Sequence, residues 1–83
     1  VCEPESGRTL TVLTTEPVLQ FYSGVGLDGS LKGKDGKTYE KFGAFCLEAQ
    51  EYADAINVPE LGNYTIKPEE TFTSTTIYRF GVK

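Results

Sequence analysis

The chain contains no histidine, tryptophan or methionine and only two cysteines. Without histidine there is no Ser-His-Asp triad, no Cys-His pair and no histidine-containing metal site. Two cysteines alone rarely hold zinc. We therefore expect no metal site, and any acid–base chemistry within this chain has to come from carboxylates.

Long apolar runs are also absent, because the longest extend over a few residues, such as 44–47. This pattern contains neither a membrane span nor a signal-peptide core. The chain is nevertheless too apolar for a disordered segment, since 39% of its residues are hydrophobic and ten are Phe or Tyr. Residues 1–83 are expected to form a single small domain with a thin core, or a fragment of a larger one.

Positive charge is scarce, with twelve acidic residues against eight basic ones and a net charge of −4. This balance disfavours a nucleic acid as partner. Four lysines gather within residues 32–41, but acidic residues lie among them, which favours a solvated hairpin over an anion site. The glycine pair Gly24 and Gly26 is not followed by Gly-Lys-Ser/Thr, so a phosphate-binding loop is not expected.

Four segments carry β-branched or alternating patterns, and none has sustained helical periodicity. The sequence therefore predicts an all-β, antiparallel fold. The continuous apolar character of the third segment predicts burial on both of its faces. The expected strands are residues 8–15, 18–22, 42–48 and 72–80.

Two features depend on the compartment in which the chain resides. Cys2 and Cys46 could close a loop of about forty residues, worth ~4 kcal/mol in the chain-entropy model. The alternative is a buried thiol at Cys46 and an unpaired terminal Cys2. Asn63 begins an Asn-Tyr-Thr glycosylation sequon, which matters only in a secretory route and often occurs by chance.

Gln20 and Glu48 are the polar residues that stand out against apolar strands. Gln20 interrupts an apolar run, either as an edge-strand side chain or as a group that faces a site. Glu48 closes the apolar segment 44–47, where partial loss of solvent would suit a general base near neutral pH. The more common situation is a solvated glutamate at a strand end.

Several segments together resemble the C-terminal part of the aldose 1-epimerases, the galactose mutarotases. The Thr-Glu-Pro-x-x-Gln-Phe-Tyr motif at residues 15–22 and the Phe-Cys-Leu-Glu motif at residues 45–48 carry most of this resemblance. Residues 27–34 and 54–57 agree in order and spacing, so the resemblance extends from about Ser6 to Phe80.

The resemblance implies a large antiparallel β-sandwich that interconverts the anomers of free hexoses without a metal or organic cofactor. It implies that Glu48 is the general base, that Gln20 contacts the sugar, and that a histidine before Val1 is the acid. Near the expected site the chain departs from the family pattern at Val25, Gly26, Phe42, Ala49 and Ala53, which puts retention of the sugar in doubt.

Three interpretations stay open at this point. The chain is a mutarotase fragment, inactive alone, whose partner segment supplies the histidine; or it is a free-standing non-catalytic β protein that binds a carbohydrate or another protein; or it is an engineered or storage protein. Unpaired strand edges predict self-association or a complementary chain. A mutarotase-like chain would be cytoplasmic, whereas a Cys2–Cys46 disulfide would indicate secretion.

Overall fold

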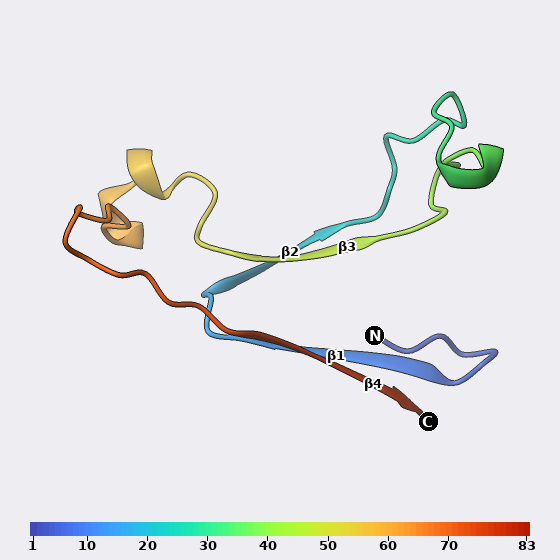
Figure 1. The fold of residues 1–83 in the computed structure, drawn as a ribbon, viewed down its shortest axis with the longest axis horizontal. Helices are drawn as coiled ribbons and strands as arrows, with labels where there is room; N and C mark the ends of the chain where they lie inside the picture. The colour runs from blue at the N-terminus through green and yellow to red at the C-terminus, as the bar shows by residue number, and fades with distance from the viewer. The chain divides into compact units, whose positions relative to one another are not determined.

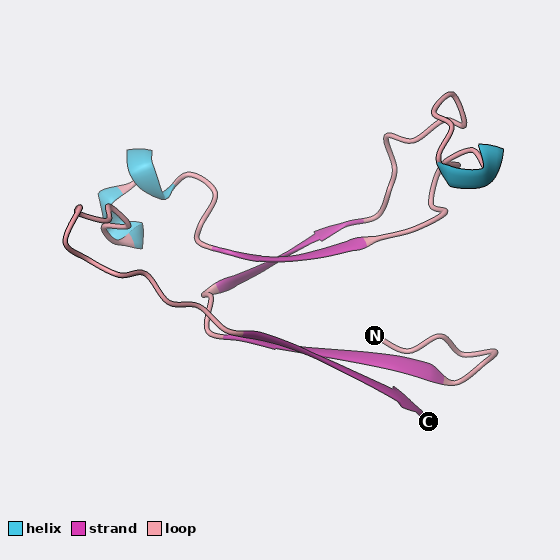
Figure 2. Cartoon of the chain, viewed as in Figure 1, coloured by secondary structure: helices cyan, strands magenta, loops and turns pink.

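A computed structural model describes all 83 residues as four strands and three short 3-10 helices (Figures 1 and 2). The strands form two separate two-stranded sheets, and no α-helix is present. None of the helices has the length and apolarity needed to cross a membrane. The all-β expectation is therefore confirmed. The elements are β1 (Arg8–Thr14), β2 (Val18–Tyr22), η1 (Lys34–Gly36), β3 (Cys46–Gln50), η2 (Ala55–Asn57), η3 (Pro59–Leu61) and β4 (Thr76–Val82).

The chain divides into two compact units. One contains residues 1–18 and 49–83, and the other contains residues 19–48. Each unit is built around one of the two sheets, so they are described separately below. The expectation of a single domain over residues 1–83 stays a prediction.

The first unit is organised by antiparallel pairing of β1 with β4, in a register that runs from Arg8 opposite Val82 to Thr14 opposite Thr76. β1 is rich in threonine and aliphatic residues, which suit a pleated, half-buried surface. Beyond the strands, the Lys83 amide donates to the Gly7 carbonyl at 2.8 Å. The chain start adds to β1, because the ammonium group of Val1 donates to the Leu10 carbonyl at 2.8 Å.

The second unit contains most of the β2–β3 sheet, from Leu19 and up to Glu48, and the long connection between its strands. Within this connection Lys32 and Thr38 form an isolated antiparallel bridge, and η1 makes the turn between them. Asp35 adopts φ 58° at that turn, a conformation that Asp tolerates better than most residues. The lysines of this segment are mostly exposed, so the solvated hairpin is confirmed.

The third strand differs from the prediction in its bounds and in its burial. β3 begins at Cys46 rather than at residue 42, because Phe42 adopts φ 60° and cannot continue an extended strand. Burial on both faces was also wrong, since Phe45 is 46% exposed and Cys46 is exposed as well. An apolar run indicates that a segment needs cover, and its own unit provides no layer that covers this one.

The fourth strand is shifted toward the C-terminus relative to the prediction. β4 extends from Thr76 to Val82 instead of covering residues 72–80. Its start coincides with the end of its partner, because Thr76 pairs with Thr14, the last residue of β1. Pairing with β1 therefore sets the bounds of β4, and the local alternation does not.

The hydrophobic core is smaller than the thin core that the sequence predicted. Ala55 is the one buried apolar residue, at 9% exposure. Large side chains stay open to solvent on both sheets, including Phe21 at 58% and Phe80 at 78%. Within its own unit, each sheet therefore has large apolar side chains that no other element covers.

Candidate functional site

The two predicted site residues lie on neighbouring strands of one sheet. Gln20 is the third of five residues in β2, and Glu48 is the third of five residues in β3. The two strands run antiparallel (Figure 1). Each is thus the middle residue of one of two paired strands. We call Gln20 and Glu48 the polar pair.

Both side chains of this pair are open to solvent. The side-chain nitrogen Nε2 of Gln20 donates to the Phe21 carbonyl at 3.4 Å, which is a long and weak hydrogen bond. The partial loss of solvent expected for Glu48 is not found in this chain, because nothing covers that face of the sheet. Both side chains are therefore accessible from solvent.

Tyr22 is a neighbour of this pair that the sequence analysis missed. It lies two positions from Gln20 on the same strand, so both side chains point to the same face. Its hydroxyl oxygen accepts a hydrogen bond from the Gly26 amide at 3.1 Å. Tyr22 therefore ties the loop after β2 to the polar face. Period-two spacing from Gln20 is the signal that could have identified it.

The opposite face of this sheet is aromatic. The rings of Phe21 and Phe45 lie with their centroids 6.1 Å apart and their planes tilted by 35°. Phe42 joins them, with the ammonium group of Lys41 at 5.2 Å from its ring centroid. These rings border an open hollow of about 480 Å³, also lined by Ser23, Gly43 and Ala44. The β2–β3 sheet is therefore amphipathic, with a polar and an aromatic face.

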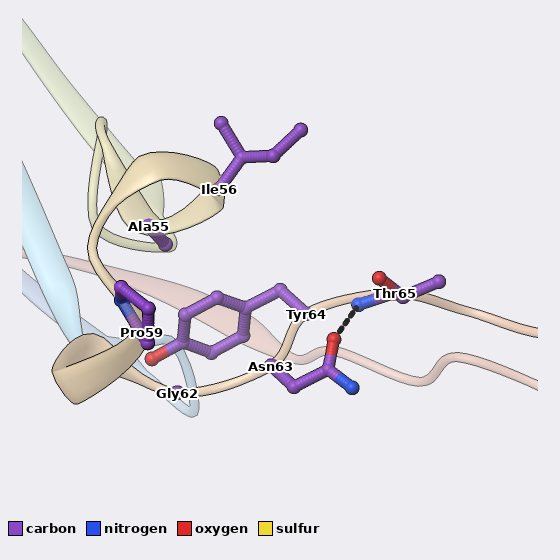
Figure 3. Close-up of a pocket in the computed structure, with 7 residues that line it drawn as sticks. All are labelled: Ala55, Ile56, Pro59, Gly62, Asn63, Tyr64 and Thr65. Carbon is purple, nitrogen blue, oxygen red and sulfur yellow. Dashed lines mark hydrogen bonds between the residues drawn. The ribbon is translucent and has the colours of Figure 1, made fainter.

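A second hollow, of about 360 Å³, belongs to the other unit and is shown in Figure 3. Its polar groups are already used locally, because the Tyr64 hydroxyl donates to the Leu61 carbonyl. The side-chain oxygen of Asn63 accepts from the Thr65 amide at 3.1 Å. The hollow thus offers few free groups that could orient a ligand. It is lined by Ala55, Ile56, Pro59, Gly62, Asn63, Tyr64 and Thr65.

One tyrosine near this hollow has a perturbed acidity. Loss of solvent around the hydroxyl, together with the nearby charges of Glu51 and Tyr52, raises the pKa of Tyr64 above its usual value. One carboxylate oxygen of Glu51, Oε2, is buried without a hydrogen-bond partner. Because its pKa is raised, Tyr64 stays neutral to higher pH than a free tyrosine.

The chain has no group of three or more His, Cys, Asp or Glu side chains that could hold a metal ion.

The remaining predicted features, a disulfide and a glycosylation site, are not decided by the structure. Cys2 and Cys46 are exposed free thiols that belong to different units, so the disulfide between them stays a prediction. Asn63 is exposed, and its glycosylation likewise stays a prediction.

Comparison with known proteins identifies the family of the chain. Residues 1–79 match the aldose 1-epimerase family. The chain belongs to that family. The two signature segments of this aldose 1-epimerase chain, residues 15–22 and 45–48, contribute the strands that carry Gln20 and Glu48. The resemblance inferred from the sequence is therefore confirmed.

Several relatives of this aldose 1-epimerase chain align with nearly all of it. It is 48% identical over 77 residues to the galactose mutarotase of Rattus norvegicus and 49% identical over 77 residues to that of Bos taurus. Each alignment covers 93% of this chain and 22% of the relative. An uncharacterised isomerase of Saccharomyces cerevisiae is 35% identical over 80 residues, which cover 95% of this chain and 21% of the yeast protein. The chain thus spans about a fifth of the length of these relatives.

Proposed function

We propose that this chain contributes the general base and one sugar contact to a site that interconverts the anomers of a free hexose. The observation that carries this proposal is the position of Gln20 and Glu48 at the centres of two paired strands in a member of the aldose 1-epimerase family. The relatives named galactose mutarotase support a hexose as substrate.

In the proposed reaction Glu48 accepts the proton of the anomeric hydroxyl. The electron pair of that O–H bond forms the C1 carbonyl, the bond between C1 and the ring oxygen breaks, and an acid protonates the ring oxygen. Rotation about the C1–C2 bond then exposes the other face of the carbonyl. The reverse steps close the ring as the opposite anomer and return both protons, so no net redox change occurs.

Gln20 would hold the sugar against Glu48. Its side-chain amide has an acceptor oxygen and two donor hydrogens, which suits hydroxyl groups that act as both donors and acceptors. Its present hydrogen bond, at 3.4 Å, is weak enough to be exchanged for a ligand. Holding the hexose in a reactive orientation is itself a large part of catalysis.

The acid that the family resemblance implies is a histidine, and the 83 residues contain none, so we place it on another segment. A complementary segment would supply it, add further sugar contacts and remove solvent from Glu48. One general acid or base contributes roughly 10²- to 10⁴-fold to a rate, and the loss of positioning contacts costs more. The chain alone is therefore expected to be nearly inactive.

Polarimetry on fresh α-D-galactose and α-D-glucose tests this proposal. The purified chain alone should leave mutarotation close to the buffer rate. Co-expression with the part of bovine galactose mutarotase that precedes the matched region should produce a clear acceleration. Glu48→Gln should then lower that rate by roughly 10²- to 10⁴-fold.

Glu69→Gln is the matched control, because Glu69 is an exposed glutamate in a turn of the other unit. It should leave the rate of the complemented chain unchanged. A complemented Glu48→Gln chain that keeps its full rate would refute the role of Glu48. Strong acceleration by the chain alone, abolished by Glu48→Gln, would show that another carboxyl group such as Asp54 or Glu51 replaces the histidine.

The second candidate is a free-standing, non-catalytic β protein that binds a carbohydrate or another protein. It is favoured by one observation: the side chains of Gln20 and Glu48 are both open to solvent, so a ligand could reach them without any further residue. Binding of galactose to the chain alone, measured by amide chemical shifts without any mutarotation, would favour it. Binding that requires the complementary segment would favour the catalytic site.

A further inference from the structure

Tyr22 is the next residue after Gln20 whose side chain projects from the same face of β2. A strand rises about 3.3 Å per residue, so the two Cα atoms lie roughly 6.6 Å apart along it. The side chains of Gln20 and Tyr22 are therefore neighbours. A segment that the Tyr22 side chain holds in place lies on the same side of the strand as Gln20.

The segment that Tyr22 holds is the turn of residues 24–27. The Leu27 amide donates to the Gly24 carbonyl at 3.1 Å and closes this turn. A turn closed between its first and fourth residues does not use the amide of its third residue, here Gly26. The Gly26 amide donates to the Tyr22 hydroxyl oxygen at 3.1 Å instead. Tyr22 therefore fixes the turn to β2 through a hydrogen bond that the turn itself does not need.

This contact favours a residue without a side chain at position 26. A Cβ atom placed on Gly26 would lie 3.0 Å from the Tyr22 hydroxyl oxygen, which is tighter than an ordinary contact. Gly26 does not adopt a positive φ, so the space beside the hydroxyl favours glycine here and the backbone conformation does not. Gly26 is also one of the positions at which the chain departs from the family pattern. The structure thus links this departure to Tyr22.

We propose that Tyr22 is a positioning residue of the sugar site, because its hydrogen bond to Gly26 holds the turn of residues 24–27 on the Gln20 side of β2. This inference rests on the function proposed above, in which Gln20 contacts the sugar. The held turn limits the space beside the Gln20 amide, so a hexose hydroxyl group meets that amide in fewer orientations. When the turn is released, the sugar keeps Gln20 as a partner but loses the fixed wall beside it.

The expected effect is on sugar binding, and proton transfer should be unaffected. The Tyr22 hydroxyl neither gives nor takes a proton in the proposed reaction, so its loss weakens binding of the ground state and of the transition state alike. Such a change raises KM and leaves kcat nearly constant. A neutral hydrogen bond corresponds to about a two- to tenfold change in an equilibrium constant, so KM should rise by about that factor.

Steady-state kinetics on α-D-galactose test the proposal, with the chain complemented by the preceding part of bovine galactose mutarotase. Tyr22→Phe removes the hydroxyl and keeps the ring, so KM should rise about two- to tenfold with little change in kcat. Glu48→Gln should instead lower kcat, which gives the two proposals different signatures. Tyr39→Phe is the matched control, because Tyr39 is another exposed tyrosine of the same unit. It should leave both constants unchanged.

A double-mutant cycle tests whether Tyr22 acts through Gly26. Gly26→Ala brings a Cβ atom against the hydroxyl and should raise KM by a similar factor. In Tyr22→Phe the hydroxyl is gone, so adding Gly26→Ala should change KM little. The Gly26 amide should also exchange its hydrogen faster in Tyr22→Phe than in the wild-type chain. Circular dichroism checks the fold of each variant, and Gly26→Ala keeps the test valid if Tyr22→Phe fails to fold.

The outcomes separate this inference from the proposed function. An unchanged KM in Tyr22→Phe, a fall in its kcat, or additive effects of Tyr22→Phe and Gly26→Ala would overturn the role of Tyr22 alone. A full rate in Glu48→Gln would refute the proposed base, and the KM of Tyr22→Phe would still decide the role of Tyr22. If complementation produces no rate, galactose titration of the Gln20 side-chain amide resonances in the chain alone decides the matter. Tyr22→Phe should then weaken binding about two- to tenfold, and a wild-type Gln20 amide that does not respond to galactose would overturn both proposals.

Discussion

At the scale of single residues, Gln20 and Glu48 depend on different parts of the protein. Gln20 can offer a donor and an acceptor to a ligand from its exposed position on β2, without any further residue. Glu48 needs a covering layer before it loses solvent, and this chain does not provide one. We therefore expect that a hexose contact can survive in a chain that has no catalytic activity.

Tyr64 provides a pH-dependent prediction at this scale. Loss of solvent raises the pKa of Tyr64, so the folded chain binds this proton more tightly than the unfolded chain. This tighter proton binding contributes stability that is fully present below the usual tyrosine pKa of 10.0. The contribution is lost as the pH rises through the pKa of Tyr64 in the folded chain. Titration by tyrosinate absorbance should show a late component that Tyr64→Phe removes.

Tyr39→Phe, which removes an exposed tyrosine of the other unit, should leave that late component in place. Alkaline unfolding followed by circular dichroism should begin at higher pH in Tyr64→Phe than in the wild-type chain. An unchanged late component in Tyr64→Phe would show that another tyrosine is responsible for it.

At the scale of elements, substitution of Gly24 tests how much this position contributes to the stability of the connection after β2. It is buried, adopts φ 75°, and a Cβ atom placed there would lie 2.9 Å from the Ala44 carbonyl oxygen. Gly24→Ala therefore combines backbone strain with a steric clash, and we expect a loss of about 2–3 kcal/mol. Gly36→Ala has a similar φ of 72° but meets nothing within 4 Å, so it should cost about 1 kcal/mol.

Hydrogen exchange measures this difference locally. The amides of Leu27 and Phe42 donate to the Gly24 carbonyl at 3.1 and 3.4 Å. Both amides should exchange faster in Gly24→Ala and change little in Gly36→Ala. Equal protection in the two variants would mean that the Ala44 carbonyl moves away without cost.

The strands also show which parts of the fold local sequence determines. β2 has the predicted bounds because Pro17 and Ser23 flank a short apolar run, and both signals are local. The start of β3 was missed because the positive φ of Phe42 has no signature in the sequence, where glycine is the usual residue for that conformation. The bounds of β4 depend on β1, whose residues are distant in the sequence.

The candidate site, too, could be predicted from the sequence only in part. Gln20 and Glu48 were found as polar residues in apolar strands and through the family motifs. The pairing of their strands places them in one sheet, and single-strand patterns do not contain that information. Tyr22 was missed because its hydroxyl contact with Gly26 is a property of the folded loop.

At the scale of the whole molecule, a chain with one buried apolar residue has little stability of its own. Association should therefore contribute a large part of the measured stability, and the melting temperature should rise with protein concentration. Thermal unfolding over about a hundredfold range of concentration checks this expectation. A melting temperature independent of concentration would show that a single copy is stable alone.

The pairing of β1 with β4 also has a consequence for how the protein folds during its synthesis. Thr14 and Thr76 share a hydrogen bond at 3.0 Å although they lie 62 positions apart in the sequence. Ribosomes add about 5–20 residues per second, so β1 waits roughly 3–12 s before its partner strand has been made. Contacts of such high sequence separation also close slowly once both strands exist. During that interval the edge of β1 that later pairs with β4 lacks this partner, and pairing with another nascent chain competes with closure of the correct sheet.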